Sequence, residues 1–77
     1  MQVIYDGLVL NGTVLDILTG LRDDAGFKQM DLGKYLDFMC ENYYKMLGVQ
    51  IERTQSVYKD AQTLFNTLAK LGVMKIS

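Results

Sequence analysis

Three segments of this 77-residue chain carry apolar residues at spacings of three and four, which is the period of one helix face. The third segment is the most regular, with a 4-3-4-3 order typical of a seam between packed helices: Val57, Ala61, Leu64, Leu68 and Leu71. No single helix can bury such a stripe alone, so the three must pack on one another. The chain therefore predicts one domain, residues 1–77, with a helical core.

Capping residues and glycines set the expected limits of the first helix. We expect it over residues 13–24, with Thr13 and Asp16 as a capping box and Gly26 ending it. Gly20 within this segment costs about 1 kcal/mol of helix stability relative to alanine. The expected apolar face consists of Val14, Leu15, Ile17, Leu18 and Leu21.

The other two helices are bounded in the same way. The second should begin after Asp31 and end at Gly48, and the third should begin at Thr54 or Ser56 and end at Gly72. The second is strongly amphipathic, and its predicted apolar stripe is Leu32, Tyr35, Leu36, Met39, Tyr43, Met46 and Leu47.

Short strands are expected at both ends of the chain. Residues 2–10 contain two β-rich runs around Asp6-Gly7, a pair that suits a two-residue hairpin turn because both positions tolerate positive φ. A single strand followed by a turn is the alternative. Residues 73–76 alternate like a strand, which can pair with the N-terminal one. The expected fold class is a small helix-rich α+β domain: a three-helix core with an N-terminal strand or hairpin and a C-terminal strand.

Composition removes several kinds of chemistry. The chain has no histidine, so it has no Ser-His-Asp triad, Cys-His pair or imidazole metal ligand. Its single cysteine, Cys40, cannot form an internal disulfide or a multi-thiolate zinc site. No glycine pattern resembles a phosphate-binding loop, and no acidic cluster has the spacing of a calcium loop. We therefore expect a protein that is not an enzyme and needs no cofactor or metal.

Location and assembly follow from length and hydropathy. No apolar run approaches the roughly 20 residues of a membrane span, and the N-terminal residues lack the features of a signal peptide. A cytoplasmic protein with no membrane partner is expected. A domain of this size buries only about 60% of its unfolded surface, so leftover aromatic side chains should be buried between subunits, and we expect a homodimer.

The charges are unevenly distributed along the chain. The net charge is −1; residues 1–50 carry four basic and seven acidic side chains, whereas residues 51–77 carry four basic and two acidic ones. The total is too small for extensive neutralisation of phosphates. The asymmetry allows one mildly basic face.

The outward face of the third helix gathers amides and lysines opposite the seam: Gln55, Lys59, Gln62, Asn66 and Lys70. Amides can read adenine, and lysines can contact phosphate or guanine. Residues 54–76 also contain a Leu-x-x-x-Gly-apolar step into a strand, and this segment resembles the passage from recognition helix to wing in winged-helix DNA-binding domains. The resemblance implies a regulator that binds duplex DNA through helix 54–71, with Lys59, Gln62, Asn66 and Lys70 at the recognition positions. An ordinary solvated helix face is the alternative.

Four aromatic residues support a competing hypothesis. Phe38 and Tyr44 point away from the apolar stripe of the second helix, and Tyr58 and Phe65 lie seven residues apart on the flank of the third. Tyrosine and phenylalanine are enriched at protein interfaces. These four would form the interface of a module or inhibitor that occupies a surface of a larger protein. The alternative is that they complete a small core.

Overall fold

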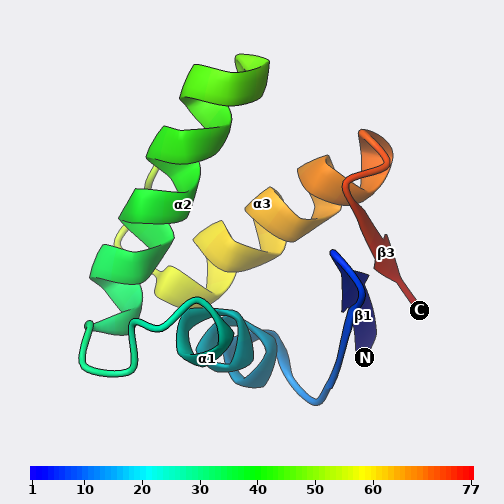
Figure 1. Cartoon of the computed structure of the whole chain (residues 1–77). Helices are drawn as coiled ribbons and strands as arrows, with labels where there is room; N and C mark the ends of the chain where they lie inside the picture. Colours follow the sequence, from blue (N-terminus) through cyan, green and yellow to red (C-terminus); the bar gives the residue numbers. More distant parts are fainter.

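A computed structural model describes residues 1–77 and contains six elements (Figure 1). Two strands come first, three helices follow, and one strand ends the chain: β1 (Gln2–Tyr5), β2 (Leu8–Asn11), α1 (Val14–Asp24), α2 (Leu32–Leu47), α3 (Val57–Lys70) and β3 (Met74–Ile76). The three strands form one antiparallel sheet. The expected helix-rich α+β class is confirmed.

The sheet has the order β2-β1-β3, with the first strand in the middle. Of the two arrangements left open for the N-terminal residues, the hairpin is present: Asp6 and Gly7 have φ of 50° and 81°, as a tight turn between twisted strands requires. The last strand returns to pair with β1, and Gln2 and Ser77 exchange backbone hydrogen bonds of 2.8 and 2.9 Å. The two ends of the chain therefore lie side by side (Figure 1).

The helix limits follow the capping residues. Thr13 and Asp16 form the capping box at the start of α1, with N–H to side-chain oxygen distances of 3.0 and 3.2 Å. Asp31 caps α2, and Gly48 ends it with a φ of 70°. Ser56 caps α3. A single strand follows α3, so the N-terminal hairpin is the only hairpin of the fold.

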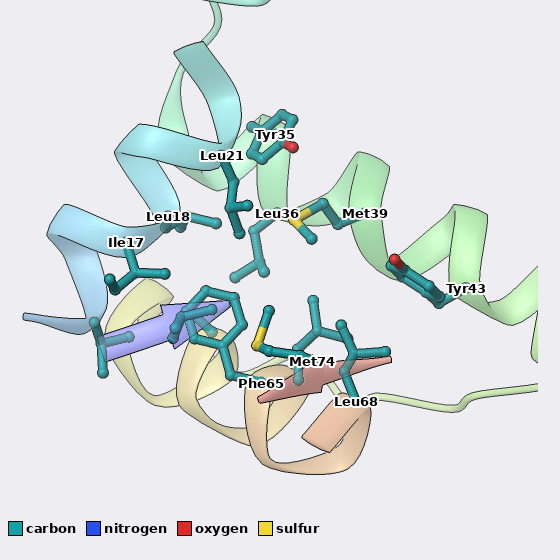
Figure 2. Close-up of a cluster of buried hydrophobic side chains, with 14 of the residues drawn as sticks. Ile17, Leu18, Leu21, Tyr35, Leu36, Met39, Tyr43, Phe65, Leu68 and Met74 are labelled. Carbon is teal, nitrogen blue, oxygen red and sulfur yellow. The ribbon is translucent and has the colours of Figure 1, made fainter. Parts of the chain in front are cut away.

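One core of 15 buried apolar residues lies between the helices and the inner face of the sheet (Figure 2). All three helices contribute to it through their predicted stripes, with Leu18 from α1, Leu36 from α2 and Leu68 from α3 fully buried. Gly20 has a packing role here, because a Cβ at this position would lie 2.8 Å from the side chain of Leu10. The glycine lets β2 approach α1 closely.

Four residues assigned to the apolar stripes lie at the surface instead: Leu15, Met46, Leu47 and Leu71. Leu71 lies beyond α3 as its C-cap residue, where the helical period no longer applies. The C-terminal end of α2, which carries Met46 and Leu47, extends past the other elements (Figure 1). The helix continues there although the core beside it has ended.

Phe65 corrects the sequence-based interface, because its side chain is only 1% exposed. It lies one position beyond the buried Leu64, on the flank of the α3 stripe, and β3 packs along this helix. The sheet therefore turns this flank of α3 into core.

A buried carboxylate holds the segment between α2 and α3. Asp60, in the first turn of α3, is 2% exposed and accepts a hydrogen bond of 2.9 Å from Arg53 Nε. It also accepts bonds from the backbone N–H and the hydroxyl of Thr54, at 2.9 and 2.8 Å. Arg53 in turn pairs with Asp37 on α2. This network ties residues 53–54 to both helices.

The network predicts a loss of stability in acid. The hydrogen bond from Arg53, helped by those from Thr54 and opposed by burial, holds the pKa of Asp60 below its usual value, and bonds from Thr13 do the same for Asp16. A pKa that is lower in the folded state stabilises the protein fully above the unfolded value, about 3.9, and this contribution disappears as the pH falls through the folded value. The urea midpoint should therefore be constant down to about pH 5 and fall steadily below about pH 4. A midpoint unchanged at pH 2 would contradict the network.

Candidate binding surfaces

The four residues predicted to contact DNA, Lys59, Gln62, Asn66 and Lys70, are all exposed on α3. Their helical spacing places them on one face. Neither lysine takes part in an ion pair. Asp60 is the only acidic residue of α3 and is buried, so this face carries positive charge without an exposed carboxylate.

The basic excess of residues 51–77 is smaller in the folded protein than a count of side chains indicates. Arg53 is engaged by Asp60 and Asp37, and it lies beside the helix rather than on its outward face. The exposed lysines left in this part of the chain are Lys59, Lys70 and Lys75.

The aromatic residues assigned to an interface do not form one patch. Phe38 packs against the rings of Phe27 and Tyr35, with centroid distances of 5.2 and 6.2 Å. Tyr44, six residues further along α2, is exposed and lies roughly 120° around the helix from Phe38. Tyr58 is exposed in the first turn of α3. With Phe65 buried, Phe38 is the one of the four that also lines a cavity.

Phe38 lines one hollow together with Met46, and Met46 lines a second one together with Leu47, where the α2 stripe continues beyond the core. These three exposed residues are here called the α2 face; their exposed fractions are 39%, 64% and 53%. The buried part of the same helix carries Tyr35, Met39 and Tyr43, which Figure 2 shows along one side of α2. The apolar stripe thus runs from the core out into solvent.

A cavity of about 280 Å³ opens beside the α2 face. Its walls are α2, the C-terminal end of α1 and the hairpin turn, and most of its lining is aromatic or apolar, including Tyr5, Leu21, Tyr35, Phe38, Tyr43 and Met46. A more open hollow of about 390 Å³ adjoins it and shares Tyr5, Tyr43 and Met46.

Two tyrosine hydroxyls join the hairpin to α2 across this cavity, since Tyr5 and Tyr43 are hydrogen-bonded to each other. Burial, followed by this hydrogen bond and by nearby negative charge that includes Asp6, raises the pKa of Tyr43. Burial, then Tyr5 and Asp24, raises the pKa of Tyr35. Both phenols are therefore protonated near neutral pH.

Two carboxylates stand at the mouth of the cavity. Asp6, from the hairpin turn, and Asp24, at the end of α1, both contribute to its lining and are exposed. Neither takes part in an ion pair, and no lysine or arginine lines the cavity. The site is therefore aromatic within and negative at its edge.

The other hollows and reactive side chains of the protein are weaker candidates for a binding site. The largest hollow, about 680 Å³ at the loop between α1 and α2, is lined by both acidic and basic side chains, including Asp23, Asp31, Lys28 and Lys34. Burial, with a smaller effect of Asp60, raises the pKa of the half-buried Cys40, so it stays a thiol near neutral pH. No three acidic or cysteine side chains gather into a possible metal site, and no helix is long and apolar enough to cross a membrane.

No family model, curated protein or solved structure matches this chain. Its own surfaces are therefore the basis for a function. Sequence reasoning missed the contribution of Tyr5, Asp6 and Asp24 to the cavity, because these residues come from separate elements and share no motif. The only local signal was the aromatic content of the α2 stripe.

Proposed function

We propose that this protein is a small, non-enzymatic, cytoplasmic binding module that occupies a surface of a larger protein through the α2 face. The observation that carries this proposal is the apolar stripe of α2, which continues beyond the core with Met46 and Leu47 more than half exposed. Contiguous exposed apolar surface with a polar rim is typical of protein interaction sites. The concave surface beside it offers room for a partner's side chains.

Charge favours a different protein over a second copy of this chain. A two-fold contact would bring the same patch of both subunits together, so that four carboxylates, Asp6 and Asp24 of each copy, would share one interface. Like charges placed across an interface cost several kcal/mol. The homodimer expected from the sequence stays a prediction, which sedimentation at micromolar concentration tests. A dimer that dissociates on Met46→Lys would assign the α2 face to a second copy.

Met46→Lys should weaken capture of the partner by about 30-fold or more, because a charge in the centre of an apolar interface removes a dominant contact. The melting temperature should change little, since Met46 is largely exposed. A photo-crosslinking residue at position 47 identifies the partner in cell extract, and titration of the purified partner measures the loss. Gln62→Lys makes the same charge change on the exposed face of α3 and should leave binding intact. Equal losses in both variants would contradict the proposal.

A second candidate function is binding of duplex DNA through α3, as in the winged-helix resemblance. The specific observation in its favour is the outward face of α3, where Lys59 and Lys70 lie free of ion pairs and no carboxylate is exposed. The two lysines would contact phosphates, and Gln62 and Asn66 would contact base edges.

Under this candidate function, Lys59→Ala or Lys70→Ala should weaken binding to every duplex and reduce the slope of log affinity against log salt by roughly one unit per lost contact. Gln62→Ala or Asn66→Ala should cost about 1–3 kcal/mol on the preferred site and little elsewhere. Gel shifts over a range of salt concentrations measure both effects. No shift of random duplex at about 100 µM protein, the weak end of non-specific binding, would rule this function out.

A further inference from the structure

We propose that the cavity between α2, the end of α1 and the hairpin turn receives a basic side chain, arginine or lysine, from the protein partner. This inference rests on the proposed function, because it names the chemistry that the partner must present beside the α2 face. It assigns the cavity a ligand class and gives the residues at its mouth a role.

The walls of the cavity suit a cation with an aliphatic stem. Tyr5, Tyr35, Phe38 and Tyr43 bring four aromatic rings to its lining. Aromatic faces attract ammonium and guanidinium groups, and the attraction is larger where water is excluded. The volume of about 280 Å³ is many times the roughly 30 Å³ that a water molecule occupies in the liquid, so a guanidinium and part of its stem fit.

The charges around the cavity have one sign. Asp6 and Asp24 lie at its mouth without ion-pair partners. The nearest basic residue in sequence to Asp24 is Arg22, which is engaged by Asp23 and by the carbonyl of Met30. The C-terminal end of α1 adds the partial negative charge of its helix dipole. No lysine or arginine lines the cavity to balance these negative charges.

The negative charge of the two carboxylates affects the pKa values of the tyrosines in the cavity. Burial is the largest cause of the raised pKa values of Tyr35 and Tyr43, and Asp24 and Asp6 respectively add to them. The carboxylates therefore act on the same rings that line the cavity, where a bound cation would meet both at once.

The position of the cavity favours a side chain of a protein over a free small molecule. Phe38 and Met46 belong both to its lining and to the α2 face. A partner segment that binds the α2 face can therefore place a basic side chain into the neighbouring cavity without a change in the direction of its backbone. Apolar contact and charge recognition would then come from adjacent residues of the partner.

The test compares two model compounds that differ in charge and not in shape: Nα-acetyl-arginine amide and Nα-acetyl-citrulline amide. Methyl and ring NMR signals of Met39, Met46 and the tyrosines report binding. We expect saturable shifts with the arginine compound and with its lysine counterpart, and much weaker ones with citrulline. Equal shifts with arginine and citrulline, or none with either, would overturn the inference.

Substitutions at the mouth of the cavity sharpen the test. Asp6→Asn and Asp24→Asn should each weaken binding of the arginine compound roughly two- to fivefold, as expected for loss of one exposed ion pair. Asparagine tolerates the positive φ of residue 6, so the hairpin turn is kept. Glu52→Gln removes the same charge outside the cavity and should have no effect. An equal loss in all three variants would show that only net charge matters, and no loss in any of them would show that the two carboxylates take no part; either result would overturn the inference.

The two proposals fail separately. If capture of the partner depends on Met46 but the cavity does not discriminate between arginine and citrulline, the proposed binding of a basic side chain is wrong, whereas the proposed binding module is supported. If the cavity discriminates between the two compounds but no partner protein is captured, the cation site is supported, whereas the proposed binding module is wrong.

Discussion

Phe65→Ala should lower the free energy of unfolding by about 3–5 kcal/mol, the usual cost of removing a fully buried phenylalanine. The side chain is 1% exposed and lies in the middle of the core cluster beside Met74 of β3 (Figure 2). A domain of this size has a total stability of only about 5 kcal/mol, so the variant should keep about 0–2 kcal/mol, and up to about half of its molecules should be unfolded at 25 °C. Urea denaturation followed by circular dichroism measures the change.

Two controls make this result specific to burial. Tyr58→Ala removes an exposed ring from the same helix, seven residues earlier, and should change stability by about 0.5 kcal/mol or less. Phe65→Leu keeps most of the apolar volume and should fold. If Phe65→Ala unfolds at the same urea concentration as the unchanged protein, α3 is oriented differently and Phe65 returns to the interface that the sequence suggested.

The helix limits were predictable because they depend on neighbours in the sequence. Thr13, Asp31 and Gly48 act within one turn of their own helices, so their roles can be read without knowing the rest of the fold. Phe65 is different, since its position on the flank of a stripe is compatible with solvent or with a sheet. Only the return of β3 to β1 decides between them.

The α2 face shows the opposite error of an argument from periodicity: two residues expected in the core are exposed. Met46 and Leu47 continue the apolar period of α2 and were therefore predicted to lie in the core. The period reports which side of the helix is apolar, whereas burial depends on whether another element lies alongside. A stripe longer than its core is the feature on which the proposed interface rests, and the sequence cannot distinguish it from a longer core.

The cavity could not have been derived at all from local patterns. Asp6 was interpreted as a turn residue, which is correct, and Asp24 ends α1 at the limit expected for the first helix, but neither local role indicates a shared site. Their shared site arises because the hairpin turn and the end of α1 meet the middle of α2, which joins residues 5, 24 and 43. Such a meeting depends on the packing of three elements.

Arg53→Met should be the most destabilising substitution of any polar residue in this chain. It leaves the carboxylate of Asp60 buried with Thr54 alone as its hydrogen-bond partner. A buried charge that loses its counter-ion keeps the whole cost of its removal from water. Lys45→Met, which breaks the exposed pair between Lys45 and Glu41, should by comparison cost about 0.5 kcal/mol or less.

The double variant Arg53→Met/Asp60→Leu should regain a large part of the lost stability, because it leaves no buried charge without a partner; Asp37, which also loses Arg53, is exposed to water. Urea titrations of the two single variants and the double variant form a cycle that measures the coupling. The difference between Arg53→Met and the unchanged protein should shrink as the pH falls, since protonation of Asp60 removes the stranded charge. A double variant no more stable than Arg53→Met would contradict the argument. It would mean that the chain needs the polar bonds themselves to hold residues 53–54 against α2 and α3.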